Sequence, residues 1–335
     1  MCTNFKMKPA ADGTIVVGRS MEFPFGIPTS LGVLPKGFTG KGAAPSGQSA
    51  SRQWTATHGV VGMVGFGNPH WLTDGMNTAG VSMHALYMPH GYCTYAAYKG
   101  DGTDLCEIDV IAYLLGTCAS VAEVKAAAAT MNVWGMDPGL GFAPPLHFLV
   151  HDAHSSMAIE FHAEGMTIVD NPTGVGTNAP YLDWHLTNLN NYVGLQATNQ
   201  TPVAALGETL APLGQGNGLL GLPGDYTGPG RFVRAAAMVA LSDVPATSSA
   251  AEMQTLHVLN AFDIPNGLIK EESGGKLVDE VTVWISIANL TNLRYAYRTA
   301  GDPGVFVIDL STVDFTQPAR TVPMSWEAGF TPVTV

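Results

Sequence analysis

The chain opens with Met1-Cys2-Thr3-Asn4-Phe5-Lys6-Met7-Lys8, and a second stretch runs Thr14-Ile15-Val16-Val17-Gly18-Arg19-Ser20-Met21-Glu22-Phe23. The first stretch alternates apolar and polar residues, which is typical of a strand. Asp12-Gly13, between the two stretches, is a turn signal. We therefore expect a hairpin whose returning strand brings Arg19 and Glu22 back beside Cys2.

Cys2 is the residue on which a catalytic interpretation depends. Removal of Met1 would leave it with a thiol, of ordinary pKa ~8.5, and a free α-amine, of ordinary pKa ~7.7–8.0. One residue could then supply both nucleophile and base. Cysteine is small enough for the initiator methionine to be removed, and the strand holds the amine in place. This arrangement predicts an N-terminal-nucleophile amidase; the alternative is that residue 2 is arbitrary and simply begins an edge strand.

Arg19 and Glu22 are the first candidates to act with Cys2. A guanidinium near a sulfur stabilises the thiolate. A nearby carboxylate could accept hydrogen bonds from the α-ammonium and orient it. The alternative is a surface ion pair, which contributes little to stability.

Composition favours a single domain and argues against nucleic acid as a partner. The 335 residues are 46% hydrophobic, enough for a large core, and no linker divides them, so we expect a single domain over residues 2–335. The net charge is −12, and the 15 basic residues form no cluster with aromatic residues, which argues against nucleic acid as a partner. Only 13% of residues are charged, which is compatible with subunit contacts.

The cysteines and the N-terminus carry little further information. Cys106 and Cys118 lie in an apolar helical pattern and are expected in the core, whereas Cys93 is expected on a loop. No cysteine or histidine has zinc-ligand spacing, so no zinc site is predicted. The absence of a signal-like segment and of about 18 consecutive apolar residues predicts no membrane span and a cytoplasmic protein. A periplasmic or secreted location is the alternative if a leader before Cys2 was removed.

The pattern along the chain predicts strands and helices without regular βαβ alternation. Asp74-Gly75-Met76-Asn77 is expected to form a turn, and Ser120 and Ser249 are expected to begin helices. The arrangement indicates antiparallel sheets covered by helices. The expected strands are 5–23, 31–34, 54–65, 80–88, 146–150, 157–161, 166–170, 281–287, 294–298 and 305–310, and the expected helices are 108–115, 120–130, 181–192, 232–241 and 249–262.

Two later positions are candidates for chemistry. The run 216–227 contains a GxGxxG, but no strand precedes it, so we expect a structured loop and not a dinucleotide site. Arg231 lies near the start of the following helix, where the helix dipole disfavours positive charge, and this suggests a specific role. Asn178 is either a cap or turn residue or a donor to an oxyanion.

The motifs described above, in their order along the chain, resemble those of the choloylglycine hydrolase family. This family comprises bile salt hydrolases and penicillin V acylases within the N-terminal-nucleophile (Ntn) hydrolase superfamily. The resemblance implies an α+β fold, a four-layer αββα sandwich of two antiparallel sheets flanked by helices. It also implies that no metal or cofactor is needed and that the chain forms a homo-oligomer, commonly a tetramer. The matching motifs are Met1-Cys2-Thr3, Gly18-Arg19-Ser20-Met21-Glu22, Asp74-Gly75-Met76-Asn77 with Gly80, Thr177-Asn178 with Pro180, Gly221-Leu222-Pro223-Gly224-Asp225 with Arg231-Phe232-Val233-Arg234, and the strand around Trp284.

The resemblance assigns catalytic roles residue by residue. Cys2 would be the nucleophile and Arg19 the neighbour that tunes it. Glu22, where many relatives have aspartate, would hold the α-amine. The Asn178 side chain and the Tyr87 backbone N–H would bind the oxyanion of an acyl-transfer reaction that passes through a thioester.

The remaining assignments concern substrate. Arg231 would complete the polar shell, and Phe23, Met21 and Phe142 would contact a small N-acyl amide. Bile salt hydrolases typically carry asparagine at the position of Tyr87 and penicillin V acylases an aromatic residue. Tyr87 and Phe23 therefore favour a penicillin V acylase-like enzyme for N-acyl compounds, a class that includes N-acyl-homoserine lactones. Conjugated bile salt hydrolysis is the alternative within the family.

Two alternatives of other classes stay open. One is a non-catalytic binding protein that kept the fold, against which the joint presence of Cys2, Arg19, Asn178 and Arg231 argues. The other is a conventional Cys–His peptidase. It requires an essential histidine, but none of the ten histidines has a recognisable catalytic context.

Overall fold

The computed structural model describes residues 1–24, 27–89, 91–273 and 275–327. Within these ranges the strands pair into two large antiparallel sheets. The first has the order β14(Val175–Gly176), β1(Cys2–Lys6), β2(Val16–Phe23), β18(Lys276–Asn289), β19(Arg294–Thr299) and β20(Phe306–Asp309), with β17(Ile269–Ser273) paired to β18. The second has the order β13(Gly165–Asp170), β12(Ser156–His162), β11(Leu146–His151), β8(Ser82–Tyr87), β7(Leu72–Asn77), β6(Val60–Gly65), β3(Thr29–Leu34) and β21(Arg320–Val322).

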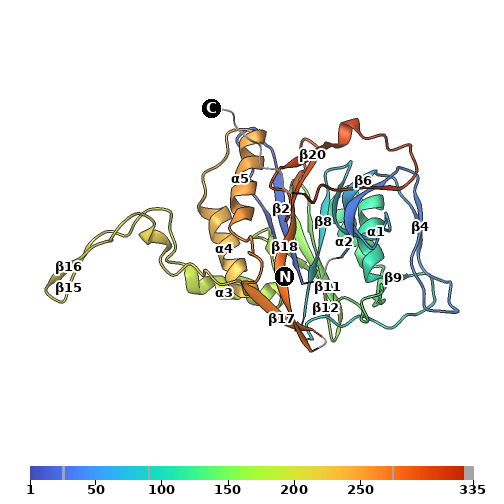
Figure 1. Ribbon diagram of the computed structural model, residues 1–335, viewed down its shortest axis with the longest axis horizontal. Helices are drawn as coiled ribbons and strands as arrows, with labels where there is room; N and C mark the ends of the chain where they lie inside the picture. Colours follow the sequence, from blue (N-terminus) through green and yellow to red (C-terminus); the bar gives the residue numbers. More distant parts are fainter. Residues whose placement is uncertain (25–26, 90, 274, 328–335) are drawn as a thin grey trace.

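Helices cover the outer face of each sheet (Figure 1). On the first sheet lie α4(Gly228–Leu241) and α5(Ser248–Asn260), with α3(Leu182–Asn188) against α4. On the second lies α1(Val110–Thr117), with α2(Val121–Ala128) against α1. The layer order is therefore helix, sheet, sheet, helix, which confirms the predicted αββα sandwich. Short 3-10 turns and strand pairs complete the described chain: η1(Glu107–Asp109), η2(Leu189–Tyr192), η3(Asn217–Leu219), η4(Leu310–Thr312), β4(Thr39–Lys41), β5(Gln53–Thr55), β9(Asp104–Cys106), β10(Asn132–Trp134), β15(Val203–Ala205) and β16(Glu208–Leu210).

The first sheet is buried on both faces, as its alternating side chains show. In β18, Ile285 and Ile287 pack in the core under the helices, whereas Trp284 and Ala288 pack in the core between the sheets. Successive residues of a strand point to opposite faces, so one strand can serve two cores. The site described below lies in this sheet, close to the layer between the sheets.

The predicted turn at Asp74-Gly75-Met76-Asn77 is wrong, because these residues form the end of β7. Gly75 allows two strands to approach closely and does not reverse the chain. A Cβ atom on Gly75 would lie 2.9 Å from the Val61 carbonyl oxygen, and one on Gly62 would lie 2.0 Å from that of Asp74. The turn comes after Asn77, where Gly80 has a φ of 80°.

One of the two predicted helix starts is correct. Ser120 caps α2, since its side chain accepts a hydrogen bond from the Glu123 N–H. Ser249 lies inside α5 and not at its start. The cap of that helix is Thr247, whose extended backbone lets its hydroxyl accept from the Ala250 N–H.

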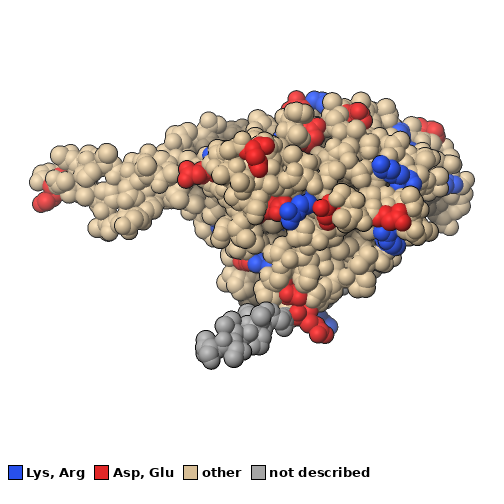
Figure 2. Space-filling view, turned by 90° about the horizontal axis from the view of Figure 1, so that it is seen from above, with Lys and Arg blue, Asp and Glu red and all other residues tan. Residues whose placement is uncertain are grey.

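A long arm projects from the body between α3 and α4 and carries β15 and β16 (Figure 1). It corresponds to the predicted structured loop and its upstream flank. Leu206 and Leu213 on this arm are almost fully exposed. On the face in view in Figure 2, lysines and arginines are scattered and do not gather over one element. The single domain, the removal of Met1 and the homo-oligomer stay predictions.

Within the described part of the chain, no helix is both long and apolar enough to cross a membrane. Cys106 and Cys118 are buried and Cys93 is half-buried on a loop, as the sequence predicted.

Glu107, in η1, is a buried carboxylate under the second sheet. Its Oε2 accepts a hydrogen bond of 2.8 Å from the Met136 N–H. Burial raises the pKa of Glu107 from 4.5 to about 8, although backbone hydrogen bonds oppose the shift. The folded protein therefore holds a proton on Glu107 in a pH range where the unfolded chain has released it.

This proton predicts how stability changes with pH. Because the pKa of Glu107 is raised in the folded state, its contribution to the free energy of unfolding is fully present below about pH 4.5. This contribution is lost as the pH rises towards 8. The free energy of unfolding of the wild type should fall across this window more steeply than that of Glu107→Gln, which cannot titrate. Denaturant unfolding at pH 5, 6, 7 and 8 measures both slopes. Identical slopes would show that Glu107 is already ionised in the folded state.

Candidate active site

The predicted hairpin places Cys2 opposite Met21. Strands β1 and β2 pair in antiparallel register, with Cys2 against Met21 and Asn4 against Arg19. Cys2 is 2% exposed, and its Sγ lies 3.8 Å from Met21 Sδ and 3.6 Å from Arg19 Nη2. No histidine in the described ranges hydrogen-bonds to this sulfur, so the geometry gives no support to a Cys–His pair.

Arg19 is fully buried beside the sulfur, so the alternative of a surface ion pair is wrong. Its Nη2 donates to the Ala85 carbonyl at 2.6 Å, and its Nε lies 3.7 Å from Asp74 Oδ2. The guanidinium carbon lies 4.4 Å from the centroid of the Trp284 ring. A cation held between a carboxylate and an aromatic face has little freedom to move.

Asp74 is the carboxylate that balances this buried cation, and sequence reasoning missed it. Its Oδ2 accepts from His84 Nδ1 at 2.6 Å and from Ser286 Oγ at 3.1 Å, and its Oδ1 accepts from Tyr295 Oη at 2.5 Å. Burial alone would raise the pKa of Asp74. However, His84, Arg19 and the Tyr295 hydroxyl hold the pKa below its ordinary value. The Asp74-Gly75 motif contains this carboxylate, but its composition predicts a turn.

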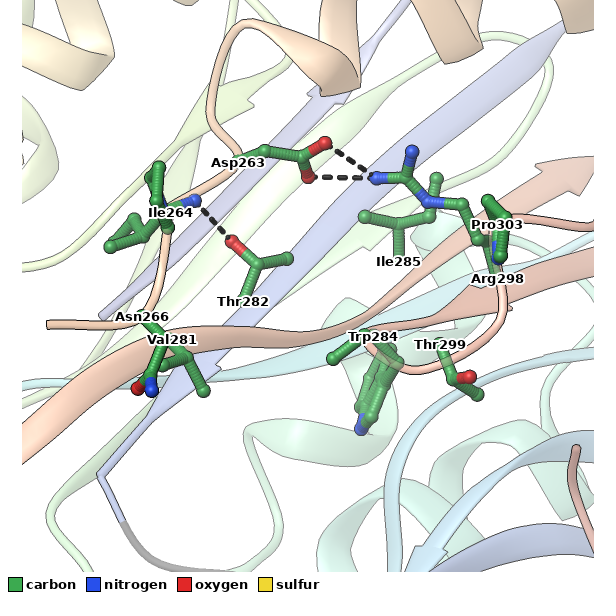
Figure 3. Close-up of a pocket in the computed structure, with 12 residues that line it drawn as sticks. Asp263, Ile264, Asn266, Val281, Thr282, Trp284, Ile285, Arg298, Thr299 and Pro303 are labelled. Carbon is green, nitrogen blue, oxygen red and sulfur yellow. Dashed lines mark hydrogen bonds and ion pairs between the residues drawn. The ribbon is translucent and has the colours of Figure 1, made fainter. Parts of the chain in front are cut away.

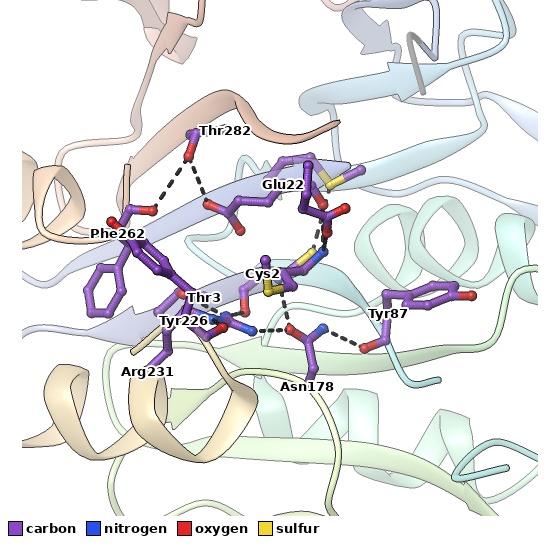
Figure 4. Close-up of polar contacts among 12 residues, drawn as sticks. Cys2, Thr3, Glu22, Tyr87, Asn178, Tyr226, Arg231, Phe262 and Thr282 are labelled. Carbon is purple, nitrogen blue, oxygen red and sulfur yellow. Dashed lines mark hydrogen bonds and ion pairs between the residues drawn. The ribbon is translucent and has the colours of Figure 1, made fainter. Parts of the chain in front are cut away.

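Asn178 and Arg231 form the other side of the site (Figure 4). Arg231 donates through Nη2 to Asn178 Oδ1 at 2.5 Å, and through Nη1 to the Cys2 carbonyl and to Thr3 Oγ1. The Cys2 N–H donates to the same Asn178 oxygen at 2.9 Å. Since Oδ1 accepts from two donors, the side-chain nitrogen of Asn178 faces the other way and donates to the Tyr87 carbonyl at 2.5 Å.

Glu22 lies near the N-terminus but does not hydrogen-bond to the Cys2 nitrogen while Met1 is in place. Its buried carboxylate accepts a 3.4 Å hydrogen bond from Thr282 Oγ1. The other oxygen, Oε2, has no hydrogen-bond partner among the described residues. Burial raises the pKa of Glu22, against the nearby positive charges of Arg231 and the N-terminus. The main chain of Glu22 exchanges two hydrogen bonds with Met1, of 2.7 and 3.0 Å.

Two pockets meet at Met1. The larger, of about 390 Å³, is lined by Asn178 and Arg231, and the smaller, of about 170 Å³, by Phe23 and Phe142. Three residues besides Met1 line both pockets: Tyr87, Glu271 and Glu280.

The structure therefore brings eight of the nine predicted site residues together, counting Cys2 itself, because each of the others contacts Cys2 or lines one of these two pockets. Met21 contacts the sulfur but lines neither pocket. Glu22 lies beside Met1. Glu280 was not predicted, since its partner is the Met1 ammonium, 279 residues away.

Another pocket, of about 510 Å³, lies elsewhere on β18 and shares no residue with the two at Met1 (Figure 3). Its wall contains Trp284 and an ion pair in which Arg298 Nη2 lies 2.7 Å from both Asp263 oxygens. Cys2 does not line it. Over the described part of the chain, no group of three His, Cys, Asp or Glu side chains is placed to hold a metal ion.

Comparison with known proteins gives consistent matches over the whole chain. Residues 2–321 match the model of the family described as linear amide C–N hydrolases, choloylglycine hydrolase family. A bile salt hydrolase/transferase of Clostridium perfringens is 30% identical over 93% of each chain, and one of Lactiplantibacillus plantarum is 36% identical over 71% of this chain and 72% of the relative. A penicillin V acylase of Pectobacterium atrosepticum is 24% identical over 94% of this chain and 82% of its own length.

A solved structure matches the fold end to end. The C2A mutant of conjugated bile acid hydrolase from Clostridium perfringens superposes with a TM-score of 0.87 at 26% identity, covering 100% of both chains. The predicted Ntn-hydrolase fold class is confirmed.

The buried ion pair beside Cys2 generates a stability prediction. Asp74→Asn removes the charge that balances Arg19, and an uncompensated buried charge costs about 3–5 kcal/mol. Asp170→Asn is the matched control, because Asp170 forms an exposed ion pair with Lys125, and exposed pairs contribute less than about 1 kcal/mol. Denaturant unfolding at neutral pH measures both losses.

Adding Arg19→Met to Asp74→Asn should recover part of the lost stability, since the buried cation is then gone as well. Equal losses in the two single variants, or no recovery in the double variant, would show that Asp74 does not balance Arg19.

Proposed function

Since this chain belongs to the choloylglycine hydrolase family of linear amide C–N hydrolases, we propose that Cys2 hydrolyses an N-acyl amide through a thioester after Met1 has been removed. The predictions of the family and of an amidohydrolase are confirmed. The assignment of roles to residues is the proposal. The observation that carries it is that Arg19, Asn178 and Arg231 all contact Cys2, at its sulfur, its nitrogen and its carbonyl oxygen.

In the first step the freed Cys2 amine accepts the proton of the Cys2 thiol. The sulfur then attacks the carbonyl carbon of the amide, and the carbonyl oxygen becomes an oxyanion. We assign the two oxyanion donors to the Asn178 side-chain nitrogen and the Tyr87 N–H. Support comes from the hydrogen bond of that nitrogen to the Tyr87 carbonyl, which places the Asn178 side chain next to the Tyr87 main chain. Each such donor is worth about 10²–10³ in rate.

In the second step the intermediate collapses. The α-ammonium gives its proton to the leaving nitrogen, the C–N bond breaks and the amine departs, leaving an acyl group on the sulfur. The amine then takes a proton from water, the hydroxide equivalent attacks the thioester, and the carboxylic acid leaves with the thiolate restored. No external oxidant, reductant or metal takes part in this balance.

Arg231 and Glu22 act on geometry and charge in this proposal. Arg231 fixes the Asn178 side chain with its nitrogen outward, because it occupies the oxygen. Glu22 supplies a buried negative charge near the N-terminus, and its partnerless oxygen is available to the Cys2 ammonium once Met1 is gone. Its side chain is one methylene longer than aspartate, so it reaches further from β2.

For substrate, we infer that conjugated bile salts come before penicillin V, which reverses the preference drawn from the sequence. The Clostridium perfringens and Lactiplantibacillus plantarum relatives, at 30% and 36% identity, are named bile salt hydrolase/transferase, whereas the penicillin V acylase is 24% identical. Penicillin V acylase activity remains the second candidate because of one observation. The Phe23 and Tyr87 rings lie 6.4 Å apart, edge to face, and both line the smaller pocket, and such a wall fits an aryl acyl group.

A hydrolysis panel tests the proposal. It contains glyco- and tauro-conjugated bile salts, penicillin V, penicillin G and acyl-homoserine lactones. The wild type should release carboxylic acid from at least one amide, bile salts first, and Cys2→Ser should lose turnover by about 10⁴-fold or more while unfolding like the wild type. A folded Cys2→Ser with normal rates would remove Cys2 from the mechanism, and a wild type inactive on the whole panel would favour the non-catalytic binding protein.

The role of the α-amine has its own test. An N-terminal extension that is not removed keeps the Cys2 nitrogen in an amide, which cannot act as a base. Turnover should fall by about 10²–10⁴-fold, the usual contribution of general base catalysis. The matched control carries the same extension with a protease site directly before Cys2, and cleavage should restore the rate. Full activity of the uncleaved form would contradict the proposal.

A further inference from the structure

The main chain around Asn178 departs from the strand pairing that precedes it. Strands β1 and β14 run antiparallel, and the Lys6 N–H donates to the Gly174 carbonyl at 2.9 Å. Such hydrogen bonds recur every second residue, so an uninterrupted ladder would direct the Cys2 N–H to the Asn178 carbonyl. Instead the Cys2 N–H donates to the side-chain oxygen of Asn178 at 2.9 Å. The Asn178 carbonyl therefore needs another donor.

A buried histidine supplies that donor. His185, in α3, is 2% exposed, and its Nε2 lies 2.8 Å from the Asn178 carbonyl oxygen. A carbonyl oxygen can only accept, so Nε2 carries the proton of this hydrogen bond. The His185 ring stacks on Phe232 of α4, with centroids 4.5 Å apart and planes 9° apart, which fixes the direction of Nε2. His185 thus takes the place of the Cys2 N–H at this carbonyl.

A second buried histidine holds the residue before Asn178. His147, in β11, is 5% exposed, and its Nε2 lies 3.0 Å from the Thr177 carbonyl oxygen. Its neighbour in the chain, Leu146, pairs with Tyr87 at the end of β8. The strand that holds Thr177 in place therefore also pairs with the residue that supplies the other proposed oxyanion donor.

Both imidazoles are neutral and donate from the same ring nitrogen. Burial lowers the pKa of His147 from 6.5 to about 4, although the hydrogen bond to Thr177 opposes the shift. Burial also lowers the pKa of His185, against its hydrogen bond to Asn178. With the single proton on Nε2, the buried Nδ1 of each ring has no hydrogen-bond partner among the described residues. Two rings buried at this cost, both bound to the main chain at Asn178, indicate a role in placing that residue.

We propose that His185 and His147 are positioning residues for the oxyanion site. By binding the carbonyls of Asn178 and Thr177, they hold this main chain away from the β1 ladder. The Asn178 side chain is then directed to the Cys2 nitrogen and to the Tyr87 main chain. The inference rests on the proposed function, because it concerns one of the two oxyanion donors assigned there. Neither histidine exchanges a proton with the substrate.

Two substitutions separate the ring of His185 from its hydrogen bond. His185→Phe keeps a ring against Phe232 but has no donor for the Asn178 carbonyl. With cholylglycine as substrate its kcat should fall about 10- to 100-fold with little change in KM, because a misplaced oxyanion donor loses part of a contribution of about 10²–10³. His185→Gln carries an N–H at about the reach of Nε2 and should restore most of the rate. If His185→Phe does not fold, His147→Leu and His147→Gln repeat the comparison at the Thr177 carbonyl.

A double-mutant cycle with Asn178→Ala tests whether the histidine acts through Asn178. In the Asn178→Ala background, His185→Phe should slow kcat no further, because the donor that it positions is already gone. Thr255→Val is the matched control for the loss of a buried donor. The Thr255 hydroxyl is fully buried in α5 and donates to the Ala251 carbonyl at 2.7 Å, so this variant should lose stability and keep the wild-type kcat.

The two hydrogen bonds are also tested without turnover. Proton–nitrogen correlation spectra of protein labelled with nitrogen-15 in its histidines report the protonation state and tautomer of each ring. At pH 7 the rings of His147 and His185 should be neutral with the proton on Nε2. The signals are assigned by their loss in the His147→Leu and His185→Phe variants.

Three results overturn the inference: an unchanged kcat in folded His185→Phe, a further loss of rate when His185→Phe is added to Asn178→Ala, or a proton on Nδ1 of either ring. Failure of the proposed function gives a different pattern. It shows as a wild type without turnover or as Asn178→Ala with the wild-type rate. If only the inference fails, Asn178→Ala is slow and His185→Phe is fast.

Discussion

The backbone pairing of β1 is the constraint on which the site depends. This five-residue strand pairs with β2 along its whole length and with β14 at Asn4 and Phe5, and the Cys2 N–H donates to Asn178 Oδ1. Arg231 then reaches from α4 to the Cys2 carbonyl and the Thr3 hydroxyl. A chain terminus normally frays, but this one is fixed from three sides. An N-terminal residue can serve as both nucleophile and base only when its amine and its side chain keep one geometry.

Two pairs of opposite charges flank Cys2. Arg19 lies against Asp74, which His84 and Tyr295 also contact. Arg231 faces Glu22, whose negative charge opposes the effect of burial on the Arg231 pKa. Buried charges are costly, so a site that contains two guanidinium groups and several carboxylates is stable only as a whole. We infer that the site is preorganised, because removing any one charge leaves its partner buried and unbalanced.

Sequence patterns predicted the features that depend on residues close together in the chain. Features that depend on contacts between distant residues were not predicted. The hairpin of β1 and β2 and the Ser120 cap follow from alternation, turn residues and hydrogen bonds within a few positions. The Asp74-Gly75 motif has the composition of a turn. Its structural role depends on Gly62, which lies across the sheet, and on Tyr295, which is 221 residues away from Asp74. Glu280 could not be found from sequence, because only the folded sheet brings it to the N-terminus. The roles of Tyr87 and Asn178 came from the family resemblance, and the contact between them is visible only in the fold.

We propose that the first residue of the mature chain carries the acyl group during turnover. The most direct measurement is mass spectrometry of enzyme quenched in acid while it hydrolyses an N-acyl amide, followed by peptide mapping. We expect an N-terminal peptide that begins at Cys2 and is heavier by the acyl group. An acyl group on another residue, or on a peptide that still begins with Met1, would contradict it.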